Sequence, residues 1–262
     1  MEKIIWMSDP HFTAQGDVLG HDPRARLDAA IAHVNANHAD SDFCVISGDM
    51  VNRGTRPDYL AVSEALLALQ VPLLPMVGNH DDRPFFREVF ALPDTSMAKF
   101  VQYSIDTPDG LILCLDTQKT GADAGDFCAT RSDWLRDTLQ HACDKPVYIF
   151  LHHPPMALGL PMQDQSRMEN GPAFLDLLTM FPNIRHLFIG HVHRPVTGTV
   201  RGIPFATMRS VLYQAPPPRP DWTWKTFIPA AEAPNLGILM IKNGDVTLQY
   251  QQFCDYRTGV AD

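Results

Sequence analysis

The chain has 262 residues, of which 45% are hydrophobic and 19% charged, and its formal net charge is −9. This balance is typical of a globular enzyme, and the length predicts one domain spanning residues 1–262. Because an acidic chain lacks the clustered Lys and Arg that hold a phosphate backbone, nucleic-acid polymers are excluded as general partners.

Membrane and export signals are not expected in this sequence. No apolar run approaches the roughly 18 residues that a membrane span needs, and the first residues, MEKIIWMSDPHF, carry Asp and His close behind a short apolar run. We therefore expect a cytoplasmic protein with no stable membrane insertion.

Short apolar runs alternate with amphipathic segments along most of the chain. A βαβαβ unit is predicted from strands and helices at 3–8, 23–38, 42–47, 57–70 and 71–77. Further strands are expected at 99–106, 110–117, 145–151 and 184–190, with helices near 132–143 and 171–180.

The last part of the sequence predicts antiparallel hairpins. Arg201-Gly202 lies near the middle of residues 196–208, and Asn243-Gly244 lies near the middle of residues 236–253. An Asn-Gly pair favours a tight two-residue turn. Between the hairpins, the segment APPPRPDWTW carries Trp222 and Trp224. It could form a lip over an active site, a subunit contact or an internal packing corner.

Five predicted strands end directly in residues that bind metals well, in the stretches IIWMSDPH, CVISGDMVNRG, LPMVGNHDD, YIFLHHPP and LFIGHVH. In an open α/β sheet, ligands gather outside the carboxyl ends of the strands. The side chains expected at this rim are Asp9, His11, Asp49, Asn79, His80, His152, His153, His191 and His193.

The spacing and chemistry of these residues indicate a metal site. Asp9 and His11 are two residues apart and share a face of an extended segment, as do His191 and His193. Glycines precede several candidates, which permits either a close backbone approach or an ordinary turn. Carboxylate and imidazole without thiolate favour Zn, Mn, Fe or Co. Seven plausible ligands suit two ions that share a carboxylate.

The ordered motifs D-x-H, G-D-x-x-x-x-G, G-N-H-D, H-x-P and G-H-x-H, from Asp9 to His193, resemble the calcineurin-like metallophosphoesterase superfamily. The stretches GDMVNRGTRPDYL, GNHDDR, LHHPP with a later ENG, and ATMRSVLYQ resemble its bacterial branch of cyclic nucleotide phosphodiesterases and glycerophosphodiesterases. The resemblance implies an α/β fold, a four-layer β-sandwich flanked by helices, with the metal site at the carboxyl ends of the strands.

The resemblance also implies a role for each motif residue. The first metal would be held by Asp9, His11, Asp49 and His193, and the second by Asn79, His152, His191 and again Asp49. Asp49 would bridge because a carboxylate offers two oxygens, whereas Asn79 offers one neutral carbonyl oxygen. His80 would be the catalytic residue on the leaving-group side. Asn79, His80 and His153 would contact substrate, with simple packing as the alternative for His153.

The expected reaction is hydrolysis of a small phosphodiester, a cyclic nucleotide or a glycerophosphodiester, by a metal-bridging hydroxide. Two divalent ions and two aspartates leave a site charge of about +2, which suits an anionic ester. Arg167 is the single basic residue of the loop 154–174, which favours small diesters. The alternatives are a phosphomonoesterase or phospholipase-C-like hydrolase of the same fold, or a non-enzymatic scaffold. We expect a homo-oligomer, with residues 211–262 as a C-terminal extension and hairpin that contacts another subunit.

Overall fold

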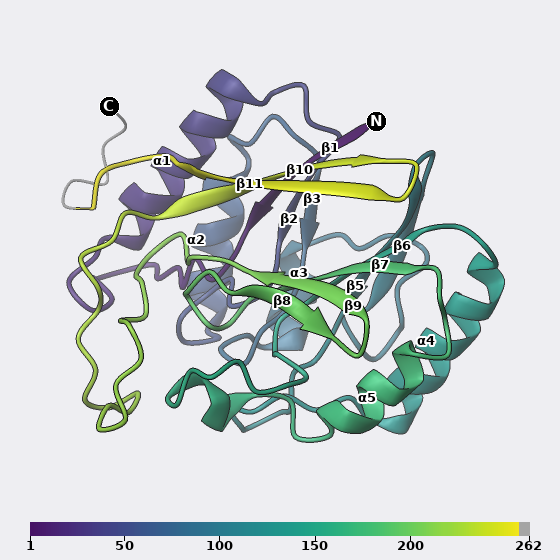
Figure 1. Cartoon of the computed structure of the whole chain (residues 1–262). Coiled ribbons are helices and arrows are strands. Elements are labelled where there is room, and N and C mark those ends of the chain that lie inside the picture. The colour runs from purple at the N-terminus through teal and green to yellow at the C-terminus, as the bar shows by residue number, and fades with distance from the viewer. Residues whose placement is uncertain (257–262) are drawn as a thin grey trace.

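The computed structural model describes residues 1–256 as two β-sheets packed face to face between helices (Figure 1). The strands are β1 Glu2–Met7, β2 Phe43–Ile46, β3 Leu73–Pro75, β4 Tyr103–Thr107, β5 Gly110–Leu115, β6 Val147–Leu151, β7 Ile184–Ile189, β8 Thr197–Val200, β9 Ile203–Thr207, β10 Asn235–Lys242 and β11 Asp245–Gln252. The helices are α1 Pro23–Asn37, α2 Arg56–Leu66, α3 Arg83–Val89, α4 Ala129–Ala142 and α5 Gly171–Leu178, with a 3₁₀ turn η1 at Gln163–Ser166.

Both sheets are mixed. The first has the strand order β11-β10-β1-β2-β3, in which β1, β2 and β3 are parallel and the C-terminal hairpin pairs antiparallel with β1. The second has the order β4-β5-β6-β7-β9-β8, with β5, β6, β7 and β9 parallel. The hairpin predicted at the C-terminus therefore completes the sheet that begins at the N-terminus.

Three apolar layers hold the molecule together. Between the sheets, fully buried Trp6 packs edge-on against Phe188 and Phe150, with ring centroids 5.4 and 6.2 Å apart. A second layer lies between the first sheet and α1 and α2, and a third between the second sheet and α4 and α5. The four-layer α/β sandwich predicted from the sequence is confirmed.

Local sequence explains where the helices begin. Asp22 accepts the backbone N–H groups of Arg24 and Ala25, and Pro23 occupies the first helical position of α1. Asp82 caps α3 in the same way, by accepting the N–H of Phe85. Neither α3 nor η1 was predicted from the sequence, because elements of seven and four residues are too short to show a helical period.

The hairpin turns are as predicted, whereas one strand is shorter. Asn243 and Gly244 both have positive φ, as a two-residue turn of this type requires. The strand expected at 99–106 begins only at Tyr103. The preceding backbone turns away because the N–H of Val101 donates to the buried carboxylate of Asp116, at 2.9 Å.

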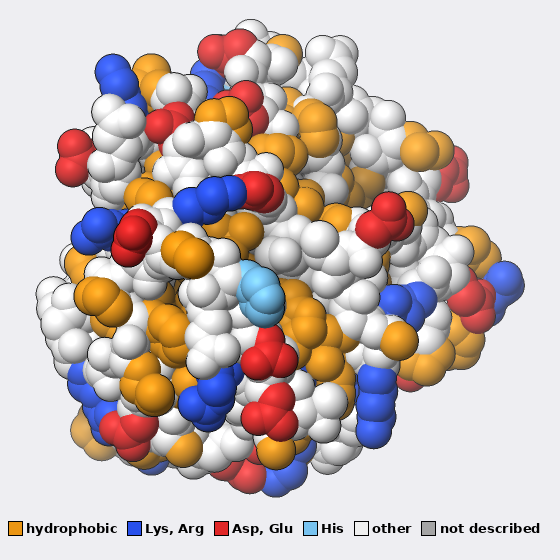
Figure 2. Space-filling view, turned by 90° about the vertical axis from the view of Figure 1, so that its right-hand side faces the viewer, with side chains coloured by type: hydrophobic (Ala, Val, Ile, Leu, Met, Phe, Trp, Pro, Cys, Tyr) orange, Lys and Arg blue, Asp and Glu red, His pale blue; other side chains and the backbone are white. Residues whose placement is uncertain are grey.

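On the face shown in Figure 2, Lys and Arg side chains are scattered among Asp and Glu, as expected for an acidic chain. Within residues 1–256 we find no helix with the length and apolar character of a membrane span. The homo-oligomer, the subunit contact by 211–262 and the cytoplasmic location stay predictions, and residues 257–262 of that segment lie outside the described residues.

Candidate metal centre

Loops that follow five parallel strands meet at one rim of the two sheets. Asp9 and His11 follow β1, Asp49 follows β2, Asn79 and His80 follow β3, His152 and His153 follow β6, and His191 and His193 follow β7. Groups of Asp and His from this set bring possible ligand atoms within 4.8 Å of one another. The structure therefore brings together all nine residues predicted for the rim.

The backbone at this rim is held in an uncommon conformation. Five of the predicted ligands have a positive φ between 43° and 69°, namely Asp9, His11, Asp49, His191 and His193. Such a conformation costs a non-glycine residue on the order of 1–3 kcal/mol, and it clusters at functional sites. It persists here because the loops support one another, as when the His11 N–H donates to the Asp49 carbonyl at 2.9 Å.

Glycines allow the loops to approach this closely. A Cβ on Gly78 would lie 2.2 Å from Oδ1 of Asp49, and a Cβ on Gly48 would lie 2.4 Å from Nδ1 of His152. Either contact is too short for real atoms, so a side chain at these positions would displace a predicted ligand. Close approach, one of the two readings of these glycines, is therefore confirmed.

One half of the centre is formed by Asp9, His11 and His193. The Nε2 atoms of the two histidines lie 3.1 Å apart, and Oδ1 of Asp9 lies 3.3 Å from Nε2 of His193. Nδ1 of His193 donates to the carbonyl of Tyr213 at 2.9 Å, which leaves its Nε2 lone pair facing the cluster. Three side chains thus point electron pairs at one spot, as ligands of a cation do.

Asp49 lies between this half and the next. Its Oδ2 is 3.6 Å from Nε2 of His11 and 3.3 Å from Nε2 of His152. Asn79 joins the second half, with Oδ1 3.2 Å from Nε2 of His152. Nδ1 of His152 donates to the carbonyl of Ser47 at 2.8 Å, so that Nε2 is the ring nitrogen that faces Asp49 and Asn79.

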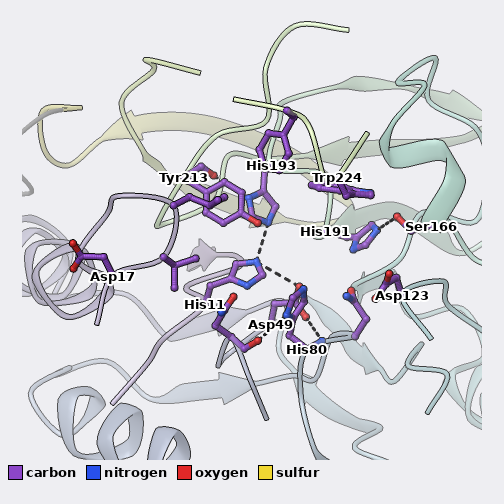
Figure 3. Close-up of a pocket in the computed structure, with 15 residues that line it drawn as sticks. His11, Asp17, Asp49, His80, Asp123, Ser166, His191, His193, Tyr213 and Trp224 are labelled. Carbon is purple, nitrogen blue, oxygen red and sulfur yellow. Dashed lines mark hydrogen bonds and ion pairs between the residues drawn. The ribbon is translucent and has the colours of Figure 1, made fainter. Parts of the chain in front are cut away.

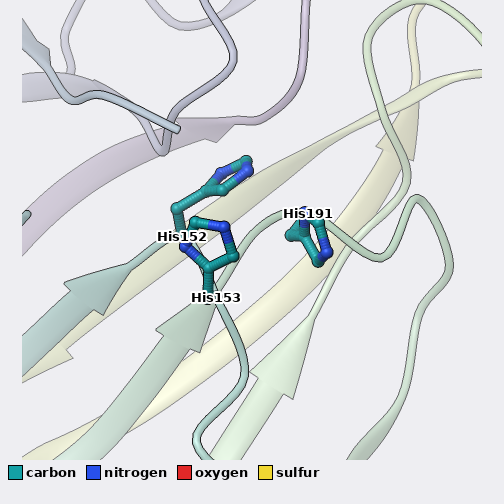
Figure 4. A group of neighbouring side chains, drawn as sticks. All are labelled: His152, His153 and His191. Carbon is teal, nitrogen blue, oxygen red and sulfur yellow. The ribbon is translucent and has the colours of Figure 1, made fainter. Parts of the chain in front are cut away.

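His191 and His153 lie side by side but differ in their partners (Figure 4). Nε2 of His191 lies 2.8 Å from the hydroxyl of Ser166, which leaves Nδ1 as its possible ligand atom. Both ring nitrogens of His153 are engaged, one with the Thr117 hydroxyl at 2.8 Å and one with the Asp123 carbonyl at 3.2 Å. Its ring is fully buried and supports the rim by packing, so substrate contact by His153 stays a prediction.

Electrostatics set protonation states that suit a bound cation. Burial alone would raise the pKa values of the two aspartates, but neighbouring histidines lower the pKa of Asp9 to about 2 and hold that of Asp49 well below its usual range. Burial lowers the pKa of His11 to about 3. Burial would also lower the pKa of His152, yet Asp49 and Asp9 together raise it to about 9. The two carboxylates therefore favour a positive charge at this point.

The residues present fit the predicted metal ions. Anionic carboxylates and neutral imidazoles are the forms in which these side chains bind transition metals. The lowered pKa values of Asp9, Asp49 and His11 favour these forms.

A cavity of about 470 Å³ opens over the cluster (Figure 3). Its lining residues are His11, Asp17, Val18, Leu19, Asp49, Asn52, Asn79, His80, Asp123, Ser166, His191, His193, Tyr213, Trp224 and Phe227. This lining includes carboxylates and aromatic rings but neither Lys nor Arg. An anion in the cavity must therefore be neutralised by bound cations and hydrogen-bond donors.

The Pro/Trp-rich segment forms one wall of this cavity. Residues 215–229 form a loop whose two ends meet, because the Ala230 N–H donates to the Gln214 carbonyl at 3.0 Å. The loop places Trp224 and Phe227 at the cavity, with ring centroids 5.5 Å apart, whereas Trp222 lines a separate small hollow. The position of Trp224 agrees with the lip over the site, and the subunit contact stays a prediction.

Among the lining residues that were not assigned from the sequence, two contact the predicted ligands. Ser166 lies in η1, and Tyr213 lies in the connection after β9. Both lie outside the strand-end motifs, so no pattern of spacing indicated them. Tyr213 is within the stretch ATMRSVLYQ, which contributed only to the narrower resemblance.

Comparison with known proteins agrees with this geometry. The model of the calcineurin-like phosphoesterase family matches residues 2–195. The chain belongs to the calcineurin-like phosphoesterase family. The predicted family, and with it the prediction of a metal-dependent phosphoesterase enzyme, is confirmed.

Relatives of this calcineurin-like phosphoesterase have been named for several phosphodiesters. A probable cyclic nucleotide phosphodiesterase of Rhodopseudomonas palustris is 35% identical over 81% of this chain and 79% of its own length. A glycerophosphodiester phosphodiesterase of Enterobacter lignolyticus is 33% identical over 81% of this chain and 78% of its own. A 3′,5′-cyclic adenosine monophosphate phosphodiesterase of Vibrio vulnificus is 26% identical over 95% and 89%.

Solved structures share the fold of this calcineurin-like phosphoesterase. A dimetal phosphatase from Danio rerio superposes with a TM-score of 0.72 at 15% identity, covering 97% of each chain. A purple acid phosphatase from yellow lupin superposes with a TM-score of 0.66 at 14% identity, and the match covers 98% of this chain and 52% of the lupin chain. At these identities the likeness concerns the fold alone.

Proposed function

We propose that this phosphoesterase is a two-metal phosphodiesterase that hydrolyses small phosphodiesters, either cyclic nucleotides or glycerophosphodiesters. The position of Asp49 carries the proposal, because one of its carboxylate oxygens lies within 3.6 Å of both His11 and His152. A carboxylate between two groups of ligands suits two ions that share it. Named relatives at 35% and 33% identity support a diester substrate.

In this proposal the ligands divide as the geometry groups them. Asp9, His11 and His193 would hold the first ion, and Asn79, His152 and His191 the second, with Asp49 between them. Mn, Fe, Zn or Co suit this donor set. Such ions would lower the pKa of a bound water and neutralise the negative charge of the ester.

His80 is placed to assist the leaving group. Its Nδ1 donates to the carbonyl of Asn52 at 2.8 Å, so Nε2 remains for a substrate. Burial lowers the pKa of His80, but the charge of Asp49 and the bond to Asn52 outweigh it, and the pKa is raised. A partly protonated imidazole at the cavity can give its proton to the departing alkoxide.

The cavity wall suits the organic part of a small diester. Trp224 and Phe227 offer apolar rings, and Asp17 and Asp123 lie exposed in the lining. The absence of Lys and Arg from the described lining disfavours substrates with additional phosphates. Nothing in this wall favours a long polymer over a single diester.

A substrate panel tests the function. The purified protein would be stripped with a chelator and reconstituted separately with Mn, Fe, Co and Zn. Turnover would be measured on 3′,5′-cAMP, 2′,3′-cAMP, glycerophosphocholine, glycerophosphoethanolamine and a nitrophenyl monoester. We expect metal-dependent hydrolysis of at least one diester. Activity on the monoester alone would favour the phosphomonoesterase, and no turnover with any metal would contradict the proposal.

The role of His80 has its own test. In His80→Ala, the metal content should be unchanged, and kcat should fall much more for alkyl leaving groups than for nitrophenolate, which needs no proton. Equal losses for both leaving groups would reject His80 as the acid.

A further inference from the structure

The side chain of Tyr213 extends from the connection after β9 to the middle of the cavity. Its ring lies 4.4 Å from that of His193 and 5.4 Å from that of His11, measured between centroids. The residue is 8% exposed and contributes to the cavity lining. In Figure 3 the ring points from its loop toward these two histidines.

The backbone fixes the position of this ring relative to the metal centre. The carbonyl of Tyr213 accepts the Nδ1 proton of His193 at 2.9 Å. Two residues later, the N–H of Ala215 donates to the carbonyl of His193 at 3.1 Å. Upstream, the Ser210 hydroxyl donates to the carbonyl of Asp9 at 2.7 Å. These bonds fix the position of the Tyr213 ring relative to two predicted ligands, His193 and Asp9.

Two donors in the cavity are engaged with protein atoms, and the side-chain amides of Asn52 and Asn79 also belong to the lining. The Ser166 hydroxyl is engaged with His191, and Nδ1 of His80 is engaged with Asn52. The lining contains neither Lys nor Arg. The hydroxyl of Tyr213, by contrast, makes no hydrogen bond to any other residue between 1 and 256. Because Tyr213 lines the cavity, this hydroxyl is open to a ligand that enters there.

We propose that the Tyr213 hydroxyl donates a hydrogen bond to a non-bridging oxygen of the bound phosphodiester, which makes Tyr213 a second catalytic residue beside His80. This inference rests on the proposed phosphodiesterase activity. His80 and Tyr213 both lie against His11, with His80 at 4.7 Å between ring centroids. One group can thus serve the leaving oxygen while the other serves the phosphoryl oxygen.

The chemistry balances without a change at the phenol. Water supplies the oxygen of the new P–O bond and releases one proton to solvent, the P–O bond to the leaving alcohol breaks, and His80 protonates the departing alkoxide and regains its proton from solvent. The products are a phosphomonoester and an alcohol, which remain one molecule when the diester is cyclic. Tyr213 keeps its proton throughout and stabilises the charge that gathers on the phosphoryl oxygens in the transition state.

The decisive variant is Tyr213→Phe, which removes one oxygen and keeps the ring packing on His11 and His193. We expect kcat/KM for a methyl nitrophenyl phosphodiester to fall about 100-fold, with two ions still bound and Tm unchanged. Tyr250→Phe is the matched control. This variant also removes a hydroxyl, which donates to the carbonyl of Thr207 at 2.6 Å. Tyr250 does not line the cavity, so the variant should retain full activity.

Two further readouts separate a phosphoryl contact from a structural role. The loss in Tyr213→Phe should be equal for good and poor leaving groups, unlike the loss in His80→Ala. Replacing the contacted oxygen by sulfur, in one enantiomer of the phosphorothioate diester, should slow the parent enzyme more than the variant, because sulfur accepts hydrogen bonds poorly. A loss that grows with leaving-group pKa would overturn the phosphoryl assignment, as would unchanged turnover or a loss of bound metal.

The outcomes also distinguish this inference from the proposed function. If the parent enzyme hydrolyses no diester with any metal, the proposed function fails. If the parent is active and Tyr213→Phe equals it, only the role of Tyr213 fails.

Discussion

Nε2 of His11 and Nε2 of His193 lie 3.1 Å apart, although the residues are 182 positions apart in the sequence. Two imidazole nitrogens at this distance repel one another unless a proton or a metal ion lies between them. A neutral His11 can supply that proton from Nε2 in a hydrogen bond to His193. In the proposed centre an ion would replace this hydrogen bond and link the two ends of the family motif set, and metal binding would then contribute to the stability of the fold.

Asp49→Asn should separate metal binding from folding. The amide keeps the size of the carboxylate but removes its charge and replaces one of its two oxygens by an NH₂ group, which does not bind metal ions. We expect fewer than two ions per chain by elemental analysis and a loss of turnover of more than about 100-fold. Asp28→Asn, at an exposed position of α1, is the control. Two ions and full turnover in Asp49→Asn would reject the shared carboxylate.

Ser166→Ala should weaken the second ion selectively. The serine hydroxyl lies 2.8 Å from His191, and such partners orient a metal-binding imidazole. We expect the affinity of the weaker site for Mn to fall about 10–100-fold in chelator-buffered titrations, with the tighter site unchanged. Ser63→Ala, whose hydroxyl bonds only to its own helix, should leave both affinities as they are. Equal affinities in Ser166→Ala and the parent would contradict the role.

Trp224→Ala should affect substrate binding more than chemistry. The indole lines the cavity beside the ligand cluster, and its ring centroid lies 6.3 Å from that of His191. Removing one stacking surface should raise KM for cyclic nucleotides about tenfold while kcat changes little. Trp222→Ala removes the same side chain from the same loop outside the main cavity, and it should leave KM unchanged. Similar kinetics for the two variants would show that the wall does not contact substrate.

His186→Phe should make the protein more resistant to acid. Burial lowers the pKa of His186 to about 4, so between pH 6.5 and 4 the unfolded chain binds a proton there that the folded chain does not. Stability is thus lost as pH falls through this window, by up to about 1 kcal/mol per pH unit. Phenylalanine can keep the stacking on Phe188 without a titrating group. Urea unfolding at pH 8 and pH 5 should show a smaller pH effect in the variant, and an identical effect would contradict it.

The rim was predictable from the sequence because each strand and its ligand are neighbours in the chain. The D-x-H and G-H-x-H motifs directly follow apolar runs, and the strand order of an α/β sheet then brings them together. The pattern of apolar residues and the turn residues also sufficed to predict the long helices and the two hairpins. In the case of β4, prediction failed because a distant carboxylate, Asp116, captures a backbone N–H of the expected strand.

Residues that act across loops were not predictable in this way. Ser166 and Tyr213 reach the site from connections whose path depends on packing against other loops, and neither residue type nor spacing marks them. His153 shows the converse, since its neighbour in the sequence faces the ligand cluster while its own ring nitrogens are satisfied by Thr117 and Asp123. Adjacency in the chain identified the candidate, but only the hydrogen bonds assign the two rings to different tasks.

The loop closed by Gln214 and Ala230 is structurally independent of the strands that carry the predicted ligands. A segment whose ends already meet can lengthen, shorten or change composition without disturbing strand pairing or the ligands on the other loops. In the proposed function, the metal ligands and the wall beside the organic part of the substrate therefore lie on separate parts of the chain. Changes in residues 215–229 can then alter substrate preference while the predicted ligands stay the same.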